Sequence, residues 1–257
     1  MQILNKKKNI YYLDFDGVIA DSATECINTS FLAWLKIVDD KKRGLVDSKK
    51  LIIEYALNFR YLVTPPENYY CLIDLLVDTV SQANGKINYL QFEDSFKNKV
   101  DSENIETLNK FKEIFFQTRK ERFSKKPKSE WLDENPPTKF LKKFKELTKN
   151  HNCQVKIVSR KDKESIMVWL DQTKLNINEI YGNESLENFN NSKFSLIRHL
   201  QHQNNLKSAI FIDDSPEEIY QEDWKSIFIT PIIAGWGYNH FQDNTKQVLK
   251  KIKEDLR

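Results

Sequence analysis

Long apolar runs are missing from this chain of 257 residues. No stretch approaches the roughly 20 consecutive apolar residues that a membrane span requires, so no membrane partner is expected. The segment before residue 10 has no apolar core long enough for a signal peptide, and we expect a cytoplasmic protein. Glycine is also scarce, with six residues in the whole chain.

Cysteine and net charge are low as well. Cys26, Cys71 and Cys153 lie far apart, match no metal-binding spacing and, being three, cannot all pair within one chain. We therefore expect reduced thiols, as in a cytoplasm. The formal net charge of +3 is too small to indicate nucleic acid as a partner. Hydrophobic residues make up 40% and aromatic residues 12%, which is enough for a substantial core.

Two hydrophobic patterns divide the sequence. From residue 23 to residue 127, apolar residues recur every three or four positions, which is typical of helices. Short apolar runs, at 10–13, 155–159, 179–182, 208–214 and within 226–234, have the character of buried strands and alternate with amphipathic helical segments. The pattern predicts an α/β fold: a Rossmann-like parallel sheet with helices on both faces, formed by residues 1–22 and 128–257. An all-helical domain at 23–127 interrupts this core, and Pro127, Pro136 and Pro137 mark the second boundary.

Charged and hydroxyl side chains follow the predicted strands at their carboxyl ends, where parallel α/β sheets bind ligands. They are Asp14 and Asp16; Ser159, Arg160 and Lys161; Asp213 and Asp214, with Glu217 and Glu218 beyond them; and Lys193, which opens a helix.

Carboxylates gathered at one edge repel each other unless a cation binds them. Mg²⁺ prefers one or two carboxylates together with phosphate oxygens, and a hydroxyl and an ammonium group suit the remaining phosphate oxygens. The combination indicates phosphoryl transfer, with one aspartate attacking phosphorus and the other moving protons. Each of these short segments alone is too common to indicate a function. The prediction of phosphoryl transfer depends on their occurring together, each at the end of a predicted strand.

Four segments, LDFDGVIADS, KIVSRKD, the SK of NNSKFSLI and IFIDDSPEE, resemble in this order the motifs of the haloacid dehalogenase-like superfamily of aspartate-dependent phosphohydrolases. The helical insertion matches the position of that family's helical cap, which closes over the site and selects the substrate. Relatives that dehalogenate carbon lack an acid at the position of Asp16, so the sequence resembles the phosphatases of the family.

The resemblance implies catalytic roles for three residues. Asp14 is expected to be the nucleophile that forms an aspartyl-phosphate, and Asp16 the acid and base. Lys193 is expected to pair with the nucleophile and the phosphate. Lys161 competes for this cationic role, although a lysine that opens a helix fits the family pattern better.

The same resemblance implies a Mg²⁺ site. Its expected ligands are Asp14, the backbone carbonyl of Asp16, and Asp214, with Asp213 supporting them through water. The adjacent aspartates leave open which of Asp213 and Asp214 contacts the metal directly. Glu218 stands where many relatives carry a further acid.

Substrate contacts are expected from Ser159 and Arg160 in the second motif, and from Arg60 in the insertion, whose guanidinium can bind a second anionic group or sugar hydroxyls. Exposed surface charge is the favoured alternative for the arginines of the insertion, and Trp236 either lines the cleft or packs in the core. The other residues of the insertion singled out for contact with substrate are Tyr61, Arg119 and Arg122.

We therefore predict a Mg²⁺-dependent phosphoric monoester hydrolase acting on a small phosphorylated metabolite. The segments FRYLVTPPENYY, FFQTRKERF, VSRKD and AGWGY are also similar to haloacid dehalogenase-like proteins encoded with bacterial surface-polysaccharide genes, which favours a sugar phosphate. Two alternatives remain open: a phosphomutase on the same core, and a non-catalytic binding protein of the same fold. The sequence leaves the oligomeric state undetermined.

Overall fold

The computed structural model describes residues 9–45, 49–82, 87–125, 127–175, 177–203 and 208–256. The chain folds as two compact units. Met1–Ser22 and Asn135–Arg257 form the first, here called the sheet unit, and Ala23–Glu134 forms the second, the helical unit.

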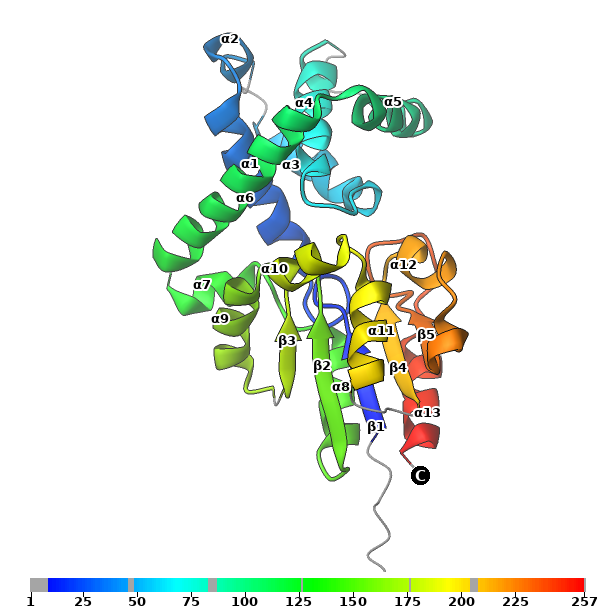
Figure 1. Cartoon of the computed structure of the whole chain (residues 1–257). Coiled ribbons are helices and arrows are strands. Elements are labelled where there is room, and N and C mark those ends of the chain that lie inside the picture. The colour runs from blue at the N-terminus through cyan, green and yellow to red at the C-terminus, as the bar shows by residue number, and fades with distance from the viewer. Residues whose placement is uncertain are drawn as a thin grey trace, which may run out of the picture. The chain divides into compact units, whose positions relative to one another are not determined.

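A five-stranded parallel sheet organises the sheet unit, in the order β3-β2-β1-β4-β5 (Figure 1). Its strands are β1 (Asn9–Leu13), β2 (Cys153–Val158), β3 (Glu179–Tyr181), β4 (Ala209–Asp213) and β5 (Ile229–Ile233). In chain order, β2 and β3 are added on one side of β1, and β4 and β5 are added on its other side. The direction of the strand order thus reverses between β1 and β4, and in this class of sheet ligands bind outside the carboxyl ends of the strands at such a point.

Helices cover both faces of this sheet because its central strands are apolar on both sides. Tyr11 packs edge-on against Phe144 of α8, with ring centroids 5.4 Å apart, whereas Tyr12 points to the opposite face and joins the core cluster beneath α11. Figure 1 shows α8 and α11 on opposite faces. The helices of the unit are α8 (Lys139–Thr148), α9 (Lys163–Thr173), α10 (Asn183–Leu186), α11 (Lys193–Gln203), α12 (Pro216–Tyr220) and α13 (Thr245–Asp255), with 3₁₀ turns η3 (Glu187–Phe189) and η4 (Trp224–Ile227).

The helical unit has its own aromatic core. Phe59 stacks on Phe92 with ring centroids 4.2 Å apart, and Tyr69 stacks on Phe115 at 5.7 Å. Its described elements are α1 (Ala23–Ile37), α2 (Asp40–Arg43), α3 (Lys49–Asn58), η2 (Arg60–Leu62), α4 (Asn68–Gln82), α5 (Tyr89–Ser102), α6 (Ile105–Lys125) and α7 (Lys128–Asp133).

The second boundary of the insertion lies later than the sequence placed it. The expected boundary falls between residues 127 and 128, but the compact helical unit extends to Glu134. The reason is α7, whose Trp131 packs edge-on against Phe123 of α6 with ring centroids 5.7 Å apart. The prolines at 127, 136 and 137 therefore lie on either side of a short helix that belongs to the insertion.

The predicted α/β class is confirmed, and the five strands fall within one or two residues of most of the expected runs. None of the three cysteines forms a disulfide. Among the described helices, none combines the length and the apolarity needed to cross a bilayer.

Candidate active site

The first site segment is the turn that follows β1. The backbone N–H of Asp14 donates to the carbonyl of Ile212 at 2.9 Å, which extends the β1–β4 ladder by one residue. Gly17 then adopts φ 77°, a left-handed conformation that glycine takes without strain, and its N–H donates to the carbonyl of Ala20 at 2.8 Å. This tight turn keeps Asp14 and Asp16 at the sheet edge.

A buried lysine joins the two strands across the crevice. Lys193 begins α11, and its Nζ lies 3.1 Å from Asp14 Oδ1 and 2.7 Å from Asp213 Oδ2. Asp14, Lys193 and Asp213 are 6%, 2% and 0% exposed. The other carboxylate oxygen of Asp213 accepts the N–H of Ser215 at 2.9 Å. This geometry places the Lys193 ammonium group in direct contact with Asp14.

Burial dominates the electrostatics of these groups. It raises the pKa of Asp14 to about 6, against the stabilising charge of Lys193 and with the added repulsion of Asp213 and Asp16. Burial likewise raises the pKa of Asp213. Burial alone would lower the pKa of Lys193, but the carboxylates of Asp14 and Asp213 outweigh it and raise that pKa. Burial thus outweighs the charge of Lys193 in setting the pKa of Asp14.

Asp214 completes a set of three acids. Asp14, Asp213 and Asp214 are all buried, and each contributes a carboxylate oxygen within 4.8 Å of the others. Several carboxylate oxygens held so close together suit a hard divalent cation such as Mg²⁺, which takes oxygen ligands. The donor set therefore fits Mg²⁺.

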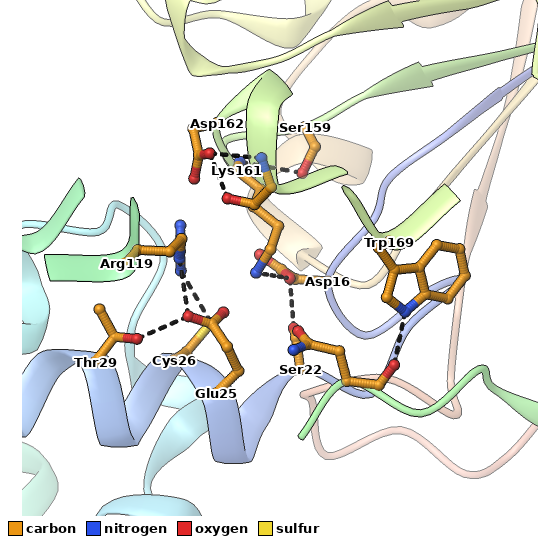
Figure 2. Close-up of polar contacts among 12 residues, drawn as sticks. Asp16, Ser22, Glu25, Cys26, Thr29, Arg119, Ser159, Lys161, Asp162 and Trp169 are labelled. Carbon is orange, nitrogen blue, oxygen red and sulfur yellow. Dashed lines mark hydrogen bonds and ion pairs between the residues drawn. The ribbon is translucent and has the colours of Figure 1, made fainter. Parts of the chain in front are cut away.

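The second aspartate of the turn has a different environment (Figure 2). Lys161 Nζ lies 3.2 Å from Asp16 Oδ1, and the hydroxyl of Ser22 donates to the same oxygen. Lys161 is buried, whereas the Asp16 side chain is 16% exposed. Ser159 is buried beside them, and its hydroxyl accepts the N–H of Lys161 at 3.3 Å.

Arg160 and Glu218 pair at the rim of the same edge. Arg160 Nη2 donates to Glu218 Oε1 at 2.5 Å, and the Arg160 side chain remains 26% exposed. The motif following β2 thus supplies one cation to Asp16 through Lys161 and another to Glu218 through Arg160.

Arg60 belongs to the helical unit. Its Nη1 donates to the carbonyl of Val63 at 2.7 Å, and its guanidinium lies over the ring of Tyr69, 5.3 Å from the ring centroid. Both contacts are local to the unit.

The expectation of surface charge at Arg119 and Arg122 is wrong. Arg119 is 2% exposed, and its Nε donates to Glu25 Oε1 at 2.9 Å (Figure 2). Arg122 is also buried, donates to the hydroxyl of Thr29 at 2.6 Å and pairs with Glu134 at 2.5 Å. The two arginines are thus internal links among α1, α6 and the end of the helical unit.

No family model matches the sequence, and no curated protein matches it. A structure from Clostridium acetobutylicum described as a predicted phosphatase is 17% identical with a TM-score of 0.59, over 97% of this chain and 100% of that one. A structure from Haemophilus somnus described as a predicted phosphoglycolate phosphatase is 14% identical with a TM-score of 0.56, over 97% and 99%. A third, from Bacteroides fragilis, is described as a haloacid dehalogenase-like hydrolase; it is 13% identical with a TM-score of 0.50, over 93% and 95%.

The chain shares the fold of these three structures. At these identities the likeness concerns the fold, and the chemistry rests on the residues of this chain. The sheet unit holds all of the predicted site residues except Arg60. They are Asp14, Asp16, Ser159, Arg160, Lys193, Asp213 and Asp214.

Sequence reasoning missed two contacts of the sheet unit. The Ser22 hydroxyl on Asp16 has no signal beyond its place at the end of the first motif. Tyr238 donates its N–H to Asp214 Oδ2 at 2.6 Å. The signal available for it was the AGWGY segment, which holds two of six glycines. There Trp236 stacks on Phe140, with ring centroids 4.5 Å apart, and also lines a cavity of about 570 Å³.

Proposed function

We propose that this protein is a Mg²⁺-dependent phosphatase that hydrolyses a small phosphorylated metabolite through an aspartyl-phosphate on Asp14. The observation that carries the proposal is the buried set of Asp14, Asp213 and Asp214 with Lys193 between two of its members. Three carboxylates held this close repel each other unless a cation binds among them, and the carboxyl ends of parallel strands are where ligands bind in this class of sheet.

The first step is an attack by a carboxylate oxygen of Asp14 on phosphorus. As the new bond forms, the bond between phosphorus and the leaving oxygen breaks, and protonated Asp16 gives its proton to that oxygen. The Ser159 hydroxyl and the Lys193 ammonium group are the donors available to phosphate oxygens at this edge. The products of the step are the free alcohol and the aspartyl-phosphate.

The second step reverses the role of Asp16. Its carboxylate takes a proton from water while the water oxygen attacks phosphorus, and the bond from phosphorus to Asp14 breaks. Inorganic phosphate leaves, and both aspartates return to their starting states. Lys161 and the Ser22 hydroxyl, which both contact Asp16 Oδ1, orient this carboxyl group.

Mg²⁺ would be held by Asp14, Asp214 and the backbone carbonyl of Asp16, with Asp213 in support. When bound, it supplies positive charge that offsets the charge of the phosphate oxygens. Arg160, which is partly exposed at the rim, is the candidate for contact with the rest of the substrate. Arg60 remains a candidate from the helical unit for a second anionic group.

A phosphate-release screen tests the proposal. The purified full chain would be assayed against sugar phosphates, nucleotides and phosphorylated small acids, with Mg²⁺ and with a chelator. We expect release of inorganic phosphate from at least one class, strongest with sugar phosphates, and loss of release on chelation. No turnover across the panel despite bound Mg²⁺ would contradict the proposal and favour a non-catalytic binding protein. Formation of an isomerised sugar phosphate with little free phosphate would identify a phosphomutase instead.

A further inference from the structure

The loop after β5 contacts Asp214, one of the three buried acids, at both its side chain and its backbone carbonyl. The backbone N–H of Tyr238 donates to Asp214 Oδ2 at 2.6 Å. The side-chain amide of Asn239 donates to the backbone carbonyl of Asp214 at 2.9 Å and to that of Ala234 at 3.0 Å. The loop therefore fixes both the side chain and the main chain of Asp214.

Two glycines leave the space that this arrangement needs. A Cβ atom on Gly237 would stand 2.3 Å from the Cβ of Asp214 and 2.6 Å from its Oδ2. A Cβ atom on Gly17, in the turn after β1, would stand 2.2 Å from the same Oδ2. Such distances are far below van der Waals contact, so a side chain at either position displaces the Asp214 carboxylate or the loop that carries it.

We propose that the loop of residues 234–239 positions Asp214 for Mg²⁺, with Gly237 and Asn239 as positioning residues that set the affinity of the site for the metal. The inference rests on the proposed function, because it takes Asp214 as a metal ligand. Groups that hydrogen-bond a ligating carboxylate fix its orientation before the metal arrives, and their loss weakens metal affinity. Here the close approach of Gly237 makes the Tyr238 N–H available to the carboxylate.

Calorimetric titration of Mg²⁺ into the substrate-free protein tests the inference directly. We expect Gly237→Ala to raise the dissociation constant for Mg²⁺ by about 10–100-fold. The matched control is Tyr238→Phe in the next residue. It removes the hydroxyl that donates to Asp21 Oδ1 at 2.9 Å, but it keeps the backbone N–H that Asp214 accepts. This control should bind Mg²⁺ as the wild type does.

The inference is overturned if folded Gly237→Ala binds Mg²⁺ with wild-type affinity, or if Tyr238→Phe weakens binding equally. Should Gly237→Ala fail to fold, Asn239→Ala replaces it, with an expected several-fold weakening, and unchanged affinity in that variant overturns the inference.

Phosphate release separates this result from the proposed function. Normal turnover in the wild type together with unchanged Mg²⁺ affinity in Gly237→Ala refutes the positioning role alone. Mg²⁺ binding that weakens in Gly237→Ala, without turnover of any ester by the wild type, supports the positioning role and refutes the phosphatase. A wild type that neither binds Mg²⁺ nor releases phosphate refutes both.

Discussion

Among the residues that the structure describes, two buried clusters differ in the numbers of acids and cations that their ion pairs and close carboxylates bring together. In the helical unit, Glu25 and Glu134 meet Arg119 and Arg122, so that two acids face two cations. At the sheet edge, five acids meet three cations: Asp14, Asp16, Asp213, Asp214 and Glu218 against Lys161, Lys193 and Arg160.

The difference separates a structural cluster from a candidate functional one. Buried charges cost free energy unless they are paired, so a cluster that serves only packing is expected to be neutral. The sheet-edge cluster keeps an excess of acid, and the pKa of Asp14 rises to about 6 as a result of burial and repulsion. A strongly perturbed acid in a strand-end crevice is a mark of a functional site. Substitutions in the two clusters should therefore have opposite consequences.

The largest expected effect is that of Asp14→Asn on turnover. The amide cannot attack phosphorus, so the rate of phosphate release from an aryl phosphate in Mg²⁺ should fall by on the order of a thousandfold or more. The thermal midpoint should not fall, because the substitution removes a repulsive buried charge and Lys193 keeps its contact with Asp213. Steady-state kinetics and thermal melts measure both quantities.

Glu217→Gln is the matched control for this substitution. Glu217 follows the same strand as Asp213, but it is exposed and accepts the hydroxyl of Ser215 at 2.7 Å. It should retain wild-type turnover. Asp14→Asn with near-normal turnover would falsify the nucleophile assignment.

The balanced cluster should respond in the opposite way. Glu25→Gln leaves Arg119 buried without its carboxylate, and breaking a buried pair in this manner costs about 3–5 kcal/mol of unfolding free energy. Denaturant titration followed by circular dichroism measures the loss. The control is Glu121→Gln on α6, the helix that carries Arg119. Its ion pair with Lys36 is exposed and should contribute little to stability. Equal stability of the two variants would show that the helical cluster is not what stabilises the unit.

The two clusters also differ in how far the sequence predicts them. Asp14 and Asp213 were predictable because each ends an apolar run, and parallel strands bring their carboxyl ends to one edge. Glu25 and Arg119 lie on two helices and are 94 residues apart in the sequence. Helical periodicity predicts which face of each helix is buried, but it does not predict which residues of another helix that face contacts. The arginines were therefore assigned to the surface. The same limit applies to Tyr238, whose contact with Asp214 uses a backbone N–H that no residue type reveals.

Mg²⁺ should stabilise the protein through the unbalanced cluster. A ligand that binds only the folded state adds about 2.7 kcal/mol at a concentration of 100 times its dissociation constant, which corresponds to a rise of several degrees in the thermal midpoint. Asp214→Asn should reduce or remove this rise in differential scanning fluorimetry. If Mg²⁺ shifts the variant as much as the wild type, the metal binds elsewhere.

The smallest predicted effect concerns Asp74, a buried acid whose charge is compensated. Although burial opposes its ionisation, hydrogen bonds from Lys42 at 2.6 Å and Lys99 at 2.9 Å lower the pKa of Asp74, whereas the pKa of Asp14 is raised. An acid with a lowered pKa in the folded state stabilises the protein above its unfolded-state pKa, and this contribution is lost as the pH falls below it. Asp74→Asn should therefore cost about 1–3 kcal/mol near neutral pH.

The cost of Asp74→Asn should stay constant down to about pH 5 and shrink below about pH 4, the range in which an unfolded aspartate titrates. Denaturant titrations of the wild type and the variant at a series of pH values measure this difference. A cost that is the same at every pH would mean that the charge of Asp74 is not what stabilises the protein, since the asparagine oxygen can still accept the N–H of Trp34 that Asp74 accepts at 3.1 Å. In that case the lysines around Asp74 would not stabilise the protein through its charge. The contrast between a compensated acid at Asp74 and an excess of acid at the sheet edge would then no longer indicate a functional site.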